Sequence, residues 1–183
     1  MRYVAISLIF LGVLVAPDLS AAAPKADITN IRGQAKGREA RVSFTLRKAF
    51  SPEMVEALKS GIEISFKTIV RVQRVHRNWF DPTVGEVTFS RSVRYDSLSR
   101  VYLLNRGKGE ESVPDIFAAL SGMTQYEVIV PLDFEIERGK KYRAWVRTRL
   151  DKVGLSETFR SIFFFSSLWD VETDWEKGDI SAP

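Results

Sequence analysis

The chain has 183 residues, of which 27 are basic and 23 acidic, so its formal net charge is +4 with histidine neutral. It has no cysteine and only one histidine, His76. This composition excludes disulfides, thiol catalysis and zinc sites built from several histidines or thiolates. Because 45% of the residues are hydrophobic, the chain can bury a proper core and is not disordered by composition. We expect a folded domain that uses neither a metal nor another cofactor.

The N-terminus has the three parts of a secretory signal peptide. Arg2 supplies a positive charge, residues 3–16 form an apolar run, and Ser20 to Ala23 offer a small-residue cleavage site. A membrane-spanning helix needs about 20 apolar residues, which is longer than this run. We therefore expect cleavage after Ala22, with residues 1–22 as the signal peptide and a soluble protein in the periplasm. The alternative is an uncleaved N-terminal anchor in the inner membrane, with the domain facing the periplasm.

The rest of the chain, residues 23–183, is expected to form one β-rich domain, because it contains no repeat, low-complexity tract or long linker. Alternation of apolar and polar side chains marks half-buried strands, as in residues 39–46. The faces of these strands predict that Phe44, Ile64, Phe66, Val146 and Leu150 are buried. The expected strands cover residues 27–32, 39–46, 62–75, 84–95, 99–104, 126–132 and 141–151.

Two short helices interrupt the strands. Residues 52–60 follow Ser51 as N-cap, with Pro52 at the first helical position and Gly61 at the C-terminal end. A second helix is expected after Ser112, with Gly122 as its stop signal. From residue 159 onward a last strand or short helix should pack across the core, and residues 179–183 are expected to be frayed.

Strands with turn signals at short spacing predict a mainly β fold. We expect an antiparallel β-sandwich of about seven strands with two short helices. The alternative is an α+β fold in which helices pack against a single antiparallel sheet.

The most distinctive chemical feature is arginine inside strands. On the last strand Arg143, Trp145, Arg147 and Arg149 project to one side, because residues two apart share a face. Arg71 and Arg74 lie on the third strand, with Trp79 following. If these strands are neighbours, the result is a basic, aromatic face suited to an anionic ligand or an acidic partner. The alternative is a solvated outer face, whose arginines pair with acids on adjacent strands.

Catalytic motifs are absent from the sequence. His76 has acids nearby in the chain, but no Gly-x-Ser-x-Gly elbow supplies a nucleophile. No residue is assigned a catalytic or metal-binding role. A nucleic-acid partner is not expected either, because an exported protein rarely meets nucleic acid and neither predicted helix has the charges of a groove-reading helix.

Several segments resemble a bacterial exported family known as domain of unknown function 4390. The most recognisable is the run from Arg94 to Tyr102, an Arg-Tyr-x-x-Leu-x-x-x-Tyr pattern. The other matching segments are residues 61–66, Val72, Arg74, Arg77, Trp79, Asp81, Tyr142, Val146, Arg147, Leu150, Asp151, Trp169 and Trp175. Glu63 and Ser156 depart from the pattern, since proline is usual at both positions.

The resemblance implies a signal peptide and no established activity, and it carries over no catalytic residues. Neighbouring genes for membrane sensor kinases, known for some members, imply an accessory role in envelope signalling. Our leading expectation is a periplasmic protein that recognises a partner or anionic ligand through the Arg/Trp face. The alternative is a hydrolase of envelope polymers, using carboxylates that the sequence does not identify.

Overall fold

The computed structural model describes residues 25–77, 79–151 and 171–182. Its two helices are α1 (Pro52–Lys59) and α2 (Ile116–Thr124). The strands are β1 (Asp27–Lys36), β2 (Glu39–Arg47), β3 (Ile64–Val75), β4 (Thr83–Asp96), β5 (Val101–Asn105), β6 (Glu110–Val113), β7 (Gln125–Pro131), β8 (Lys141–Leu150) and β9 (Glu176–Ser181).

All nine strands belong to one sheet, in the order β6-β5-β4-β3-β8-β9-β1-β2-β7. Every neighbouring pair is antiparallel except β1 and β9, which are parallel. The prediction of a mainly β fold is therefore confirmed. The strand pairing gives one continuous mixed sheet, however, and not two separate antiparallel sheets.

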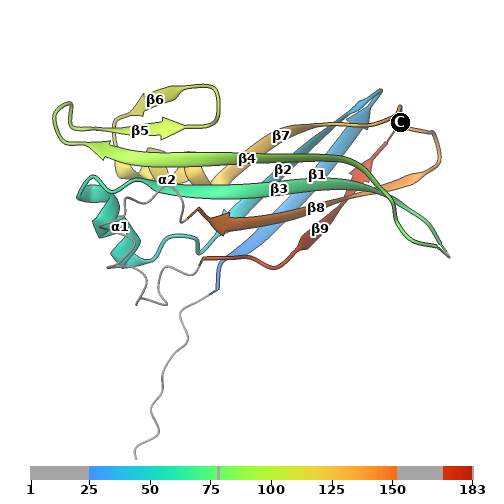
Figure 1. Cartoon of the computed structure of the whole chain (residues 1–183), viewed down its shortest axis with the longest axis horizontal. Coiled ribbons are helices and arrows are strands. Elements are labelled where there is room, and N and C mark those ends of the chain that lie inside the picture. Colours follow the sequence, from blue (N-terminus) through green and yellow to red (C-terminus); the bar gives the residue numbers. More distant parts are fainter. Residues whose placement is uncertain (1–24, 78, 152–170, 183) are drawn as a thin grey trace, which may run out of the picture.

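The sheet curls so that distant strands pack against each other. Figure 1 shows β1 and β2 crossing behind the long β3–β4 hairpin at an angle. The rings of Phe89 on β4 and Tyr126 on β7 are 6.0 Å apart, although five strands lie between β4 and β7 in the sheet order. Just beyond β7, the backbone N–H of Asp133 donates to the carbonyl of Val84, at 2.9 Å. The concave side of the sheet thus forms the core.

The core consists of the side chains that alternate onto this concave side. The predicted core residues are confirmed: Phe44, Ile64, Phe66, Val146 and Leu150 are all at most 6% exposed. Phe44 stacks on Tyr126 with ring centroids 4.6 Å apart, which ties β2 to β7. Because apolar burial is the main favourable term in folding, this continuous cluster holds the cysteine-free fold together.

Helix α1 begins and ends as its sequence predicts. The Ser51 hydroxyl accepts a hydrogen bond from the backbone N–H of Met54, at 3.3 Å. At the other end Gly61 has a φ of +87°, and the N–H of Ile62 donates to the carbonyl of Ala57. This is a Schellman ending, which glycine favours because it has no Cβ.

The second helix differs from its prediction at both ends. Ser112 lies in β6, opposite Leu103 of β5, and the N-cap of α2 is Asp115, which accepts from the N–H of Ala118 at 2.8 Å. Gly122 is inside the helix and does not end it. A Cβ added at Gly122 would clash with Cδ2 of Leu104. The glycine therefore lets α2 pack closely on β5 without a shift of the Leu104 side chain.

The expectation of a frayed C-terminus is wrong. Residues 176–181 form β9, which lies inside the sheet between β8 and β1. Ile180 is 6% exposed and belongs to the core, and Gly178 faces Ile31 so closely that an added Cβ would lie 2.6 Å from the Ile31 carbonyl oxygen. The segment expected to pack across the core from residue 159 lies largely outside the described residues.

The Arg-Tyr-x-x-Leu-x-x-x-Tyr run forms the β4–β5 hairpin. Tyr95 and Tyr102 are directly opposite each other, with ring centroids 5.0 Å apart. Between them, the Asp96 carboxylate accepts from the backbone N–H of Leu98 at 2.9 Å and from the hydroxyl of Ser99 at 3.0 Å. These hydrogen bonds lower the pKa of Asp96. The run thus encodes a turn and its cross-strand tyrosine pair.

Candidate functional site

The convex side of β4, β3, β8 and β9 carries the arginine-rich surface that the sequence predicts. Strand pairing puts Arg71 opposite Trp145, and Lys67 opposite Arg149. Arg143, Trp145, Arg147 and Arg149 alternate with the buried residues of β8 and therefore share this side. We call this surface the outer face. It comprises Lys67, Ile69, Arg71, Gln73, Glu86, Thr88, Ser90, Arg143, Trp145, Arg147, Arg149, Lys177 and Asp179.

Two of the residues expected on this surface lie elsewhere. Arg74 is opposite the buried Tyr142, so it projects to the concave side, where it forms a two-pronged ion pair with Glu137 at 2.6 and 3.2 Å. The reason is that residues three apart on a strand face opposite sides. Trp79 lies in the loop between β3 and β4 and is 84% exposed. Of the residues predicted for this surface, Arg71 and the four residues of β8 lie on the outer face.

Acids from neighbouring strands neutralise part of the outer face. Arg71 donates from Nε to Glu86 of β4, and Arg143 lies 3.5 Å from Asp179 of β9. Arg147 donates to Glu172 at 2.5 Å. For Arg71, Arg143 and Arg147, these pairs agree with the alternative that the surface is a solvated face whose arginines pair with acids on adjacent strands. Each is a partly exposed pair, of the kind that contributes at most about 1 kcal/mol.

Residues 171–177 add an aromatic element to the same surface. The N–H of Leu150 donates to the carbonyl of Val171 and the N–H of Thr173 to that of Thr148, so this segment continues β9 along β8. The indole ring of Trp175 lies 4.7 Å from the Arg71 guanidinium carbon and 5.9 Å from that of Arg147. One tryptophan thus lies against two arginines and fixes their positions.

Among the described residues, the exceptions to this neutralisation are Lys177, which lies against Trp145, and two cations at the opposite end of the outer face. Lys67 and Arg149 are direct cross-strand neighbours, and neither forms an ion pair with a residue in the described part of the chain. Ser90 is the neighbour of Lys67 on the other side, in β4. Cationic side chains opposite each other destabilise a sheet, whereas opposite charges in the same place stabilise it by roughly 0.2–1 kcal/mol. Glu172 lies opposite Arg149 on the adjoining segment, but its carboxylate pairs with Arg147. Within the described residues, Lys67 and Arg149 are therefore neighbouring cations that form no ion pair.

Sequence reasoning missed several members of the outer face. Lys67 alternates as a polar residue on β3, but its partner across the sheet depends on the register with β8. Glu172, Trp175 and Asp179 come from a segment expected to pack across the core or to fray. An alternation signal is hard to read in residues 176–181, Glu-Lys-Gly-Asp-Ile-Ser, because only Ile180 among them is apolar.

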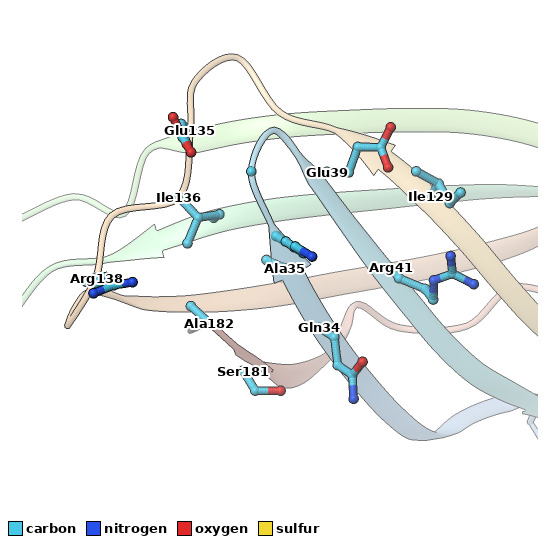
Figure 2. A pocket seen from close by; sticks show the side chains of 12 residues that line it. Gln34, Ala35, Glu39, Arg41, Ile129, Glu135, Ile136, Arg138, Ser181 and Ala182 are labelled. Atoms are coloured by element: carbon cyan, nitrogen blue, oxygen red, sulfur yellow. The ribbon is translucent and has the colours of Figure 1, made fainter.

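A cavity of about 1040 Å³ lies elsewhere, at the β1–β2 turn. Figure 2 shows that Gln34, Arg41 and Ile129 come from neighbouring strands, while Ile136 and Arg138 come from the β7–β8 loop. The carboxylates of Glu39 and Glu135 lie on opposite sides of the turn and do not converge (Figure 2). Arg41 is already paired with Glu127, at 2.6 Å. The cavity therefore offers no pair of acids placed for glycoside hydrolysis.

Other catalytic arrangements find no support in the described residues. Residues 25–77, 79–151 and 171–182 contain no group of three or more histidine, aspartate or glutamate side chains placed to hold a metal ion. The backbone N–H of His76 donates to the Asp81 carboxylate at 2.7 Å, and His76 itself lies exposed at the end of β3. Neither described helix has the length and hydrophobicity needed to cross a membrane.

Fold and surface together define a mainly β domain with one curled sheet, two short helices and a cationic, tryptophan-bearing outer face. Residues 23–179 match the family described as domain of unknown function DUF4390. The match covers most of the chain, and the protein belongs to this family. No curated protein matches the chain.

Proposed function

We propose that the protein is a binding protein of the cell envelope, which recognises an acidic partner or anionic ligand through the Lys67/Arg149 end of the outer face. The signal-peptide pattern of residues 1–22 supports a periplasmic location for the mature chain. The gene neighbourhoods known for some family members support an accessory role in envelope signalling. Catalysis has no part in this proposal.

The observation that carries the proposal is the contrast within the outer face. Arg71, Arg143 and Arg147 each have an acid on a neighbouring strand or segment. Lys67 and Arg149 face each other and form no ion pair among the described residues, because Glu172, which lies opposite Arg149, is paired with Arg147. Solvent ions or an external anion therefore relieve part of their mutual repulsion. A bound carboxylate or phosphate would accept hydrogen bonds from both side chains, and the guanidinium fork matches either group.

The surroundings of this pair suit a macromolecular partner better than an enclosed ligand. Thr88 and Ser90 extend the surface with small polar side chains, and Ile69 lies between the Lys67 and Arg71 positions. Around the pair, the described strands offer a broad sheet surface. Charge steering toward such a surface raises association rates and makes binding sensitive to salt.

The test is photo-crosslinking in living cells, with a photoreactive amino acid at Ser90. The matched control carries the same amino acid at Ile129, which is 48% exposed and lies on β7, at the far end of the sheet order from β4. We expect a discrete crosslinked product from Ser90, lost in the K67Q/R149Q double variant and kept in R32Q/R47Q. Arg32 and Arg47 are exposed residues of β1 and β2, so this control removes the same charge at another place.

Equal products from Ser90 and Ile129, or a Ser90 product unaffected by K67Q/R149Q, would overturn the proposal. The hydrolase alternative gains no support from the cavity at the β1–β2 turn, where Glu39 and Glu135 do not converge.

A further inference from the structure

A second cavity, of about 600 Å³, lies between β4, α2 and β7. Arg91 of β4 lines it, yet only 8% of this residue is exposed. Arg91 is opposite Phe66 of β3, so its side chain projects to the concave side of the sheet, opposite to the outer face. Charged side chains are rarely buried to this degree unless they are paired. The partners of Arg91 therefore decide what the cavity can hold.

Arg91 has no carboxylate partner among the described residues. Its Nη1 donates to the carbonyls of Gly122 and Gln125, at 2.9 and 2.6 Å, which are at the C-terminal end of α2. The guanidinium carbon lies 4.0 Å from the centre of the Tyr126 ring. Its Nε is buried and donates to no described residue. Carbonyl oxygens and a ring face compensate only part of a full positive charge.

A second guanidinium group, that of Arg106, lies beside Gly122, as the guanidinium of Arg91 does. Arg106 also lines the cavity, and its Nη2 lies 3.3 Å from where a Cβ on Gly122 would be. Among the described residues, the acid paired with it is Glu111, at 3.6 Å, with both side chains about half exposed. Burial lowers the pKa of Arg91, and the nearby Arg106 lowers it further. Two cations thus share the cavity with one carboxylate of its described lining, Glu127, which is already paired with Arg41 at 2.6 Å.

The rest of the lining is mixed. Ser43, Ser121 and Gln125 supply polar groups, whereas Val113 and Ala118 supply apolar surface. The volume falls in the range of roughly 300–1,000 Å³ that is typical of small-molecule sites. An inorganic ion would leave most of this space and all of its apolar lining unused.

We propose that the Arg91 cavity binds a small organic acid, whose carboxylate lies between Arg91 and Arg106 and whose apolar part packs against Val113 and Ala118. The planar guanidinium favours a carboxylate, and partial burial strengthens the charge-assisted hydrogen bonds. Ser121 and Gln125 supply further polar groups to orient the ligand. The site is separate from the outer face, since the two lie on opposite sides of the sheet.

The test measures binding of benzoate, butyrate and inorganic phosphate to the mature protein by calorimetry, with benzyl alcohol as the uncharged analogue of benzoate. All titrations use the same ionic strength, because surface charges respond to salt. We expect benzoate or butyrate to bind, benzyl alcohol not to bind, and the amide NMR signals of Ser121 and Gly122 to shift. Phosphate binding without organic-acid binding would overturn the proposal, as would equal binding of benzoate and benzyl alcohol.

The variants separate ligand recognition from folding. Arg91 holds the C-terminal end of α2, so replacing it can unfold the protein. The main variant is therefore Arg106→Gln, because the Arg106 side chain is about half exposed. We expect R106Q to keep the wild-type unfolding temperature and to bind benzoate at least about tenfold more weakly. The control E111Q removes the competing acid and should bind at least as tightly as the wild type. Unchanged affinity in R106Q would contradict the proposal, whereas K67Q/R149Q must leave benzoate binding unaffected.

Discussion

Thr68 of β3 and Thr148 of β8 face each other in the core, both with no exposed surface, and their hydroxyl oxygens are 2.9 Å apart. One hydroxyl donates to the other, which allows two polar groups in an apolar cluster. Thr148→Val alone should lower the free energy of unfolding by about 1–3 kcal/mol, because it leaves the Thr68 hydroxyl buried without this partner. Denaturant unfolding of T148V and T68V measures this.

The double variant T68V/T148V is the control for this interpretation. It replaces both hydroxyls with methyl groups of similar shape, so its stability should return close to that of the wild type. Destabilisation of the double variant by the sum of the two single effects would show that the hydroxyls do not depend on each other.

Gly178 tests the position of β9 inside the sheet. A Cβ at this residue would lie 2.6 Å from the backbone oxygen of Ile31, and backbone cannot move aside as a flexible side chain can. We expect Gly178→Ala to lower the free energy of unfolding by about 1–3 kcal/mol, as overpacking in a filled core does. Glu176→Ala, an exposed position on the same strand, should change it by less than about 0.5 kcal/mol. Equal stability of the two variants would place β9 outside the sheet interior.

Export makes a separate prediction. Mass spectrometry of the protein from the periplasmic fraction should give a mature N-terminus at Ala23, since cleavage after Ala22 leaves small residues at the two recognised positions, Ser20 and Ala22. The variant Ala22→Arg puts a large, charged side chain directly before the expected cleavage site. It should block processing and leave the longer chain in the membrane fraction. An intact Met1 in membranes of wild-type cells would contradict cleavage.

The sequence predicted the strands well where polar and apolar residues alternate over a long stretch. Residues 64–75 and 141–150 have this pattern, and the five core residues expected from such patterns are buried. The cap at Ser51 and the glycine at residue 61 predicted α1 equally well. In each of these cases the signal is local, and the tertiary structure agrees with it.

Predictions from the sequence were wrong where tertiary contacts determine the local structure. Ser112 has the chemistry of an N-cap, but pairing of β6 with β5 takes it into a strand. Gly122 has the chemistry of a helix stop, but it lies within α2, where it packs closely against Leu104. Residues 176–181 have almost no apolar pattern, because β9 has only Ile180 in the core and is held mainly by its two neighbouring strands.

For the candidate site, too, the local features could be predicted from the sequence and the non-local ones could not. Alternation placed the three arginines and Trp145 of β8 on one surface, which needs only local geometry. Which of those arginines has an acid nearby depends on strand order and register, and these are non-local. The Lys67–Arg149 pairing and the contact of Arg71 with Trp175 therefore could not be predicted from the spacing of residues along the chain.

The most direct test of the account is the Lys67→Glu variant, measured for both stability and crosslinking from Ser90. We predict a free energy of unfolding higher by about 0.2–1 kcal/mol at low salt, because Arg149 gains an opposite charge, together with loss of the crosslinked product. Arg32→Glu, which lies opposite Ser43, should change neither quantity appreciably. A Lys67→Glu protein that is no more stable than the wild type and crosslinks as well as it does would contradict the binding role of the outer face.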